Sequence, residues 1–315
     1  MPVPSVSTSA RSLTVAVALM AMTVALTGCA TSLPPSGEGT SQHSARVVRV
    51  VAAENFWGSI VAQLGGSHAD VVSIIDNPNT DPHAYEPTAA DARVLADAQV
   101  AVENGAGYDP WMPQLLAADG GSRTVLDVGN LVGVAPGGNP HLWYDPSYVE
   151  RFIGAATADL VRADPADRAY FVAQQSEYEH VGLAAYHAAI ARIRGRFAGT
   201  PVGASESIVV YLCRALGLDL VTPPAFLRAV SEGTDVSASD TATIDRQIRD
   251  RAIAVYFENT QNLTPDVEAQ VSAARAAGIS RIPVTETLVP STGTFQAWQT
   301  AQLNSLGAAL ERSHD

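Results

Sequence analysis

The chain has 315 residues, of which 47% are hydrophobic, so it is long enough and apolar enough to bury a substantial core. Its formal net charge is −13, with 32 acidic residues against 19 basic ones. This acidic balance disfavours nucleic acids and anionic lipid surfaces as binding partners.

The first 28 residues have the features of an export signal. Arg11 supplies a sparse positive region, and residues 13–26 form an apolar run that is too short for a comfortable membrane span. The run ends in Leu26-Thr27-Gly28-Cys29, which is typical of a bacterial lipobox. A chance cysteine behind an ordinary signal peptide is the alternative. We predict a signal peptide at 1–28 and a lipidated Cys29 that anchors the protein to the outer face of the cell membrane.

A flexible tether is predicted to follow the anchor. Residues 29–45 are rich in Ser, Thr, Pro and Gly and show no apolar periodicity. If Cys29 is acylated, Cys213 is the one remaining cysteine, and no intramolecular disulfide can form. Cys213 lies in the apolar helical stretch 208–216, so it is predicted to be a buried structural thiol. Roughly 270 residues then remain to fold, which favours two domains.

The first half of the folded region alternates strands with helices. Strands are predicted at 46–53, 69–75, 99–103 and 124–127, and helices at 56–64, 111–118 and after Thr88. Thr88 could cap its helix, with Asp91 as the acidic partner three residues on. This alternation is typical of an α/β fold with a mostly parallel sheet.

The longest helical region of the chain comes next. Asp145-Pro146 is predicted to begin a helix that ends near Ala163, and Asp164-Pro165 a second one that continues to Arg196 without a proline. Thirty helical residues span about 45 Å, more than the width of one domain. We predict a rigid linking helix at 165–197.

The α/β pattern resumes beyond this helix. Strands are predicted at 201–204, 252–258 and 279–284, and helices at 208–216, 265–276 and 294–312. The predicted fold class is therefore α/β, with two Rossmann-like lobes joined by one long helix. The N-terminal lobe covers 46–164 and the C-terminal lobe 198–315.

Two histidines occur in nearly matching contexts. His83 follows Asp81-Pro82 and His141 follows Asn139-Pro140, and each is closely followed by an aromatic residue and another X-Pro pair. A proline fixes its own φ and restricts the residue before it, so each imidazole follows a stiffened turn. With 7 histidines in the whole chain, this shared context points to a metal site. His180 and His187 are seven residues apart on one predicted helix, too far for a chelating pair, and are predicted to be exposed.

Two glutamates in the second half also follow strands. Glu206 comes after the strand at 201–204, and Glu286 after the strand at 279–284. Ligands bind at the carboxyl ends of parallel strands, so loops from both halves should converge on one cleft. Each glutamate has a simpler reading: Glu206 as a residue near a helix N-terminus, and Glu286 as a solvated loop residue. Glu258, after another strand, is the nearest competitor of Glu286.

From Arg46 onward the chain resembles the metal-binding solute-binding lipoproteins of ABC importers, which handle manganese, zinc and ferrous iron. Three stretches carry this resemblance: residues 81–88 (DPHAYEPT), residues 139–146 (NPHLWYDP), and Ala204-Ser205-Glu206 with Tyr211 and Gly217-Leu218. In this family two lobes hold the metal through four side chains. The resemblance implies His83, His141 and Glu206 as ligands. The fourth ligand is commonly an aspartate, whereas this chain offers Glu286, one methylene longer.

The resemblance also implies the cargo and the partners. Two neutral imidazoles and two carboxylates leave no net charge once a divalent ion is bound, and their oxygen content suits manganese, with zinc close behind and ferrous iron third. The expected partners are an ABC permease and its cytoplasmic ATPase, and the binding protein is expected to be a monomer. A secreted metal-dependent hydrolase is the main alternative, but such enzymes keep an open metal position that four protein ligands would close. An adhesive surface lipoprotein is the third reading, and it leaves the paired Pro-His loops unexplained. We therefore expect a binding protein and not an enzyme.

Overall fold

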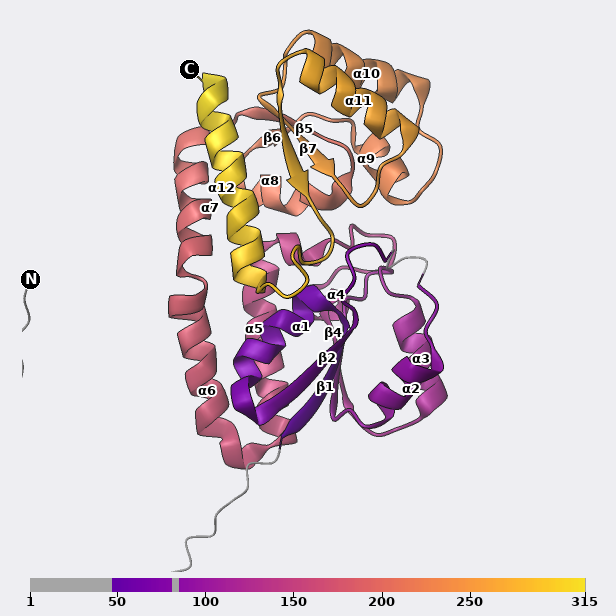
Figure 1. Cartoon of the computed structure of the whole chain (residues 1–315), viewed down its shortest axis with the longest axis vertical. Helices are drawn as coiled ribbons and strands as arrows, with labels where there is room; N and C mark the ends of the chain where they lie inside the picture. Colours follow the sequence, from indigo (N-terminus) through magenta and orange to yellow (C-terminus); the bar gives the residue numbers. More distant parts are fainter. Residues whose placement is uncertain (1–46, 81–84, 315) are drawn as a thin grey trace, which may run out of the picture. The chain divides into compact units, whose positions relative to one another are not determined.

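The computed structural model describes residues 47–80 and 85–314, which lie within one compact unit (Figure 1). The predicted signal peptide, the tether, Cys29 and His83 all lie outside the described residues. Among the residues that are described, no helix has the length and apolar character needed to cross a membrane.

Two parallel four-stranded sheets organise the described chain. The first sheet has the order β2-β1-β3-β4, and its strands are β1 (Val48–Glu54), β2 (Ala69–Ile75), β3 (Val100–Glu103) and β4 (Thr124–Asp127). The second repeats this order as β6-β5-β7-β8, and its strands are β5 (Pro201–Ala204), β6 (Asp219–Leu220), β7 (Val255–Asn259) and β8 (Ser280–Val284). The predicted α/β fold class with parallel sheets is confirmed.

Helices cover both faces of the first sheet, which explains why its inner strands are apolar on both sides. Val48, Val50 and Ala52 of β1 pack with α1 (Asn55–Gly65), while Val51 and Ala53 face the opposite layer. That layer contains α2 (Ala89–Ala96) and α3 (Trp111–Asp119), and the short α4 (Val128–Val132) follows β4. The predicted capping box is present: the Thr88 hydroxyl accepts from the Asp91 N–H, and the Asp91 carboxylate accepts from the Thr88 N–H.

The helices between the two sheets differ in one respect from the prediction. As expected, α5 (Pro146–Ala163) begins at a proline and is capped by Asp145, whose carboxylate accepts from the Ser147 N–H. The next region is not a single α-helix, because a π-helical turn (Tyr178–Gly182) separates α6 (Arg168–Glu177) from α7 (Ala184–Phe197). The turn directly before α6, Pro165–Asp167, is a 3-10 helix.

The π-turn has a packing reason. The Leu183 N–H bonds to the Tyr178 carbonyl, five residues back, which inserts one extra residue into the turn. Gly182, a poor helix former, lies inside this turn. The insertion rotates the following helix so that Tyr178, Leu183 and Tyr186 are all buried. The predicted continuous strut is therefore two α-helices joined by a π-turn.

The second sheet is likewise covered on both faces. Val202, Phe257 and Ile282 belong to the same core cluster as α8 (Val210–Leu216) and α12 (Phe295–His314), and α12 packs along α7 (Figure 1). Tyr256 faces the other layer, formed by α9 (Pro224–Ser231), α10 (Ala238–Arg249) and α11 (Pro265–Ala276). The sequence pattern did not predict β6, α9 or α10. The predicted helix at 208–216 begins two residues before α8. The predicted strand at 252–258 begins three residues before β7.

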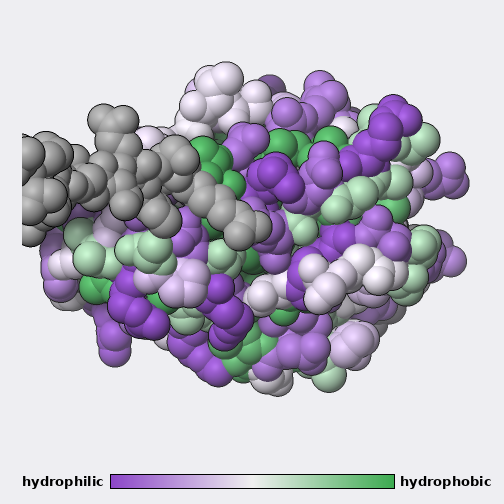
Figure 2. Space-filling model, turned by 90° about the horizontal axis from the view of Figure 1, so that it is seen from below, coloured by the Kyte–Doolittle hydropathy of each residue, from purple (hydrophilic) through white to green (hydrophobic). Residues whose placement is uncertain are grey.

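The largest core cluster runs from the first sheet through α5 and α7 to the second sheet. At its centre the Phe56 and Trp143 rings stack with centroids 3.9 Å apart. Cys213 is buried in this cluster, as predicted. Burial raises the pKa of its thiol, which is typical of a structural cysteine. On the face shown in Figure 2, hydrophilic and hydrophobic residues are interspersed.

Candidate metal centre

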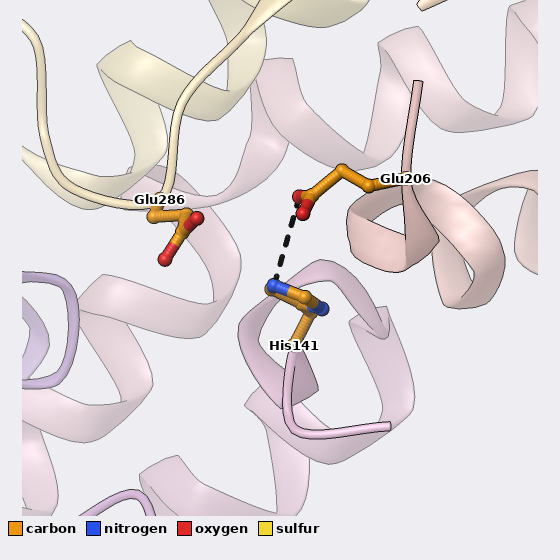
Figure 3. A group of neighbouring side chains, drawn as sticks. All are labelled: His141, Glu206 and Glu286. Atoms are coloured by element: carbon orange, nitrogen blue, oxygen red, sulfur yellow. Dashed lines mark ion pairs between the residues drawn. The ribbon is translucent and has the colours of Figure 1, made fainter. Parts of the chain in front are cut away.

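Three of the predicted site residues lie together. His141, Glu206 and Glu286 each offer one ligand atom, and these atoms all lie within 4.8 Å of one another. The Nε2 atom of His141 is 3.9 Å from Oε1 of Glu206, and Figure 3 shows the three side chains directed toward a common point. All three residues are buried, with exposed fractions of 1%, 1% and 7%. The structure thus gathers one imidazole and two carboxylates from both halves of the chain.

His141 is oriented by the residue two positions before it. The Asn139 side-chain oxygen accepts from the His141 N–H at 3.1 Å and lies 2.8 Å from the ring Nδ1. With the Nδ1 proton directed at this oxygen, the lone pair of Nε2 faces the two carboxylates, the orientation that a metal-ligating histidine needs. Asn139 also joins the two halves, because its Nδ2 donates to the Ser207 carbonyl and its own carbonyl accepts from the Tyr211 hydroxyl.

Glu206 follows β5 and is held by three donors. Asn259 Nδ2 donates to Oε1 at 2.8 Å, and Ser231 Oγ and Asn262 Nδ2 both donate to Oε2 at 3.1 Å. Burial, followed by the nearby charge of Glu286, raises the pKa of Glu206 to about 8. Two buried carboxylates at this distance repel each other, and a divalent cation would remove that repulsion.

Glu286 lies in the loop after β8 and receives donors from both halves. The Tyr108 hydroxyl donates to Oε2 at 2.8 Å, and Asn259 Nδ2 donates to Oε1 at 2.8 Å. The Glu286 backbone N–H is in turn bonded to the Gln261 side-chain oxygen at 2.6 Å. Burial and the Glu286 charge raise the pKa of Tyr108, so its hydroxyl stays protonated and remains a donor at neutral pH.

The other candidates from the sequence lie elsewhere. Glu258, the competitor of Glu286, forms an ion pair with Arg281 at 2.6 Å and is not part of the group of three. His180 is exposed as expected, but His187 is half-buried and lies 3.9 Å from a Glu150 oxygen, because it faces α5. His68 bonds to Asp167 at 2.6 Å and is likewise not part of the group of three.

A cavity of about 740 Å³ leads to the cluster. Its walls come from both halves: residues 78–80 and 137–140 on one side, and α9 with residues 260–262 on the other. Of the three clustered residues, Glu286 lines this cavity. The described residues 78–80 and Tyr85 also flank the segment that contains His83.

The chain has two parallel sheets, each covered by helices on both faces. Both halves contribute residues to a buried cluster of one imidazole and two carboxylates. These features define a metal-binding protein of the two-lobed α/β class. The chain belongs to the family described as zinc-uptake complex component A, periplasmic, whose model matches residues 50–309. The family comprises the periplasmic metal-binding components of zinc, manganese and iron uptake systems of the ABC type. These systems also contain a permease and an ATPase. They are solute-binding proteins and not enzymes, which decides against the hydrolase alternative.

Individual relatives bind different metals. The chain is 26% identical over 168 residues to the manganese-binding lipoprotein MntA of Halalkalibacterium halodurans, an alignment that covers 51% of this chain and 53% of MntA. It is 24% identical over 258 residues to the zinc-binding protein TroA of Treponema pallidum, covering 75% of this chain and 80% of TroA. The solved structure of TroA matches with a TM-score of 0.71 at 20% identity, over 84% of this chain and 99% of TroA. The family resemblance predicted from the sequence is confirmed, and these names leave the metal open.

Proposed function

We propose that this protein captures a divalent transition metal in the cavity between its two halves and delivers it to an ABC permease driven by a cytoplasmic ATPase. The proposed ligands are His83, His141, Glu206 and Glu286. The observation that carries the proposal is the group of three buried ligand atoms within 4.8 Å, contributed by loops from both halves. His83, in the matching Pro-His context, is the proposed fourth ligand. The proposed boundaries are 46–164 and 198–315 for the lobes and 165–197 for the link.

Manganese is the favoured cargo, zinc the second and ferrous iron the third. Two carboxylates neutralise the ion and supply hard oxygen donors, which suit manganese better than a histidine-rich set would. The Glu206 and Glu286 carboxylates are both buried, so this neutralisation happens away from water, where it matters most. Zinc binds such sites strongly by the Irving–Williams order, so affinity alone does not identify the cargo.

The first test is metal-dependent stability. An ion that binds only the folded state stabilises it by mass action, by about 2.7 kcal/mol when the free ion is at 100 times its Kd. Millimolar Mn²⁺ and Zn²⁺ should therefore each raise the melting temperature by several degrees, and EDTA should reverse the rise. Scanning fluorimetry checks this. If both metals leave the melting curve unchanged, the proposed function is wrong.

Membrane attachment is proposed to depend on Cys29. We expect the Cys29→Ser protein to be recovered in the soluble extracytoplasmic fraction, because acyl chains are then no longer attached to the N-terminus. The wild-type protein should sediment with membranes and be released by detergent. Cell fractionation with immunoblotting makes the comparison, and size-exclusion chromatography of the protein without residues 1–45 tests the proposed monomer. Equal membrane association of the two forms would rule out the lipid anchor.

A further inference from the structure

We propose that Asn259 is a positioning residue that presents the Glu206 and Glu286 carboxylates to a single ion before that ion arrives. Asn259 is the last residue of β7 and is fully buried. Its Nδ2 lies 2.8 Å from Oε1 of Glu206 and 2.8 Å from Oε1 of Glu286. An amide nitrogen carries two hydrogens, so it can donate one to each carboxylate. The inference rests on the proposed function and concerns how the site is assembled.

The orientation of this amide is fixed by its other contacts. Its Oδ1 accepts from the Gln261 N–H at 3.0 Å, so the nitrogen must face the carboxylates. The Asn259 backbone N–H donates to Ser205 Oγ at 3.0 Å, which ties β7 to the loop that carries Glu206. The Asn259 side-chain amide is therefore held in place from two sides. It needs no rearrangement to donate to both carboxylates.

This arrangement reduces the energy needed to assemble the site. Two carboxylates in a buried site repel each other strongly, because there is little water to screen them. A shared donor offsets part of that repulsion and keeps both Oε1 atoms near the position of the ion. Binding is tighter when a site is already in its bound arrangement, since less ordering remains to be done.

The same network indicates which oxygen of Glu206 meets the ion. Oε2 accepts from both Ser231 and Asn262, which occupies its two lone pairs. Oε1 accepts from Asn259, keeps one lone pair and lies 3.9 Å from His141 Nε2. Glu206 is thus presented as a ligand through one oxygen. In Glu286 each oxygen accepts one hydrogen bond, so each keeps a lone pair for the ion.

The test compares two substitutions of Asn259 by titration calorimetry with Mn²⁺ alone and with Zn²⁺ alone. Asn259→Asp keeps the size of the side chain but has no donor, and Asn259→Ala removes both size and donor. Both should weaken Mn²⁺ and Zn²⁺ binding by about 10- to 100-fold, the usual effect of removing a partner that orients a metal ligand. Asn304→Asp is the matched control, since it makes the same substitution on α12, where the Asn304 side chain is exposed and bonds to Arg192 instead of a carboxylate. It should keep wild-type affinity.

Spectra of the Co²⁺-loaded proteins supply a readout that packing alone would not change. The visible bands of Co²⁺ depend on the number and placement of its ligands, so they should change in the Asn259 variants and stay unchanged in Asn304→Asp. Wild-type affinity in Asn259→Asp, with a loss only in Asn259→Ala, would show a packing role and overturn the proposal. If Asn259→Asp does not fold, full affinity in Asn259→Ala overturns it instead. Failure of the wild-type protein to bind metal would reject the proposed function itself.

Discussion

Replacing Glu286 with glutamine is expected to remove most of the metal-induced rise in melting temperature. Both oxygens of this carboxylate accept hydrogen bonds, from Tyr108 and from Asn259, and a glutamine amide can offer only one of them an oxygen. The substitution also takes away one of the two negative charges that neutralise the ion. Metal affinity should fall by more than about 100-fold, because disturbing the outer partners of a ligand alone costs about 10- to 100-fold.

A hundredfold weaker Kd removes about 2.7 kcal/mol of metal-dependent stabilisation at saturating metal. Scanning fluorimetry with and without millimolar Mn²⁺ or Zn²⁺ measures this difference. Glu258→Gln is the control, because Glu258 is similarly buried but its carboxylate is paired with Arg281. It should keep the full metal-induced rise, even though loss of the ion pair lowers the melting temperature of the metal-free protein. The opposite pattern would make Glu258 the ligand in place of Glu286.

The elements that could be predicted from the sequence are those with strong local signals. Prolines at the starts of α5 and α11, the capping box at Thr88 and the apolar runs of the strands act within a few residues of their effect. The convergence of His141, Glu206 and Glu286 could also be anticipated, because parallel strands place their following loops at one edge of a sheet. His83 lies outside the described residues, so its part in the cluster stays a prediction.

The missed elements lack such signals. The buried residues of α10 are Ile244 and Ile248, too few to establish a helical period. Helix α9 begins at the second residue of Pro223-Pro224, a pair that is typical of a turn. The π-turn at Tyr178–Gly182 depends on which residues the two sheets bury, which is not a local property.

The donors around the carboxylates were missed for a related reason. Asn259 ends β7 one residue after Glu258, and strand alternation turns their side chains in opposite directions. The rule that singled out glutamates after strands could therefore have led to Asn259, had amides been considered together with carboxylates. Tyr108 gave no such signal, because its contact with Glu286 spans 178 residues of sequence.

A second group of acidic residues, which are not among the proposed metal ligands, is expected to make the stability of this protein depend on pH. Glu54, at the end of β1, is fully buried near Asp109 and Glu103, and the ion pairs found among the described residues include none of these three. Burial, followed by the charges of Asp109 and Glu103, raises the pKa of Glu54 well above its usual value. Burial also raises the pKa of Glu103 to about 7 and that of Asp109 to about 6.

The sign of the effect follows from proton binding. Between the ordinary carboxyl pKa and these raised values, the folded state binds more protons than the unfolded state, so the free energy of unfolding falls as pH rises. Each such group contributes up to about 1.4 kcal/mol per pH unit within its window. For Glu103 that window runs from 4.5 to about 7, and for Asp109 from 3.8 to about 6. The metal-free protein should therefore melt at a higher temperature near pH 5.5 than near pH 8.

The Glu54→Gln variant isolates one member of this group. Glutamine has the size of a protonated glutamate and is neutral at every pH, so the buried site no longer favours proton uptake. As pH rises, the free energy of unfolding of the variant should fall less steeply than that of the wild type, by up to about 1.4 kcal/mol per pH unit. Near pH 8 the variant should have the higher melting temperature. Comparing two metal-free proteins cancels the titration of Glu206, which both retain. A variant that is less stable than the wild type at every pH would mean that Glu54 is ionised in the fold and stabilises it as a charge.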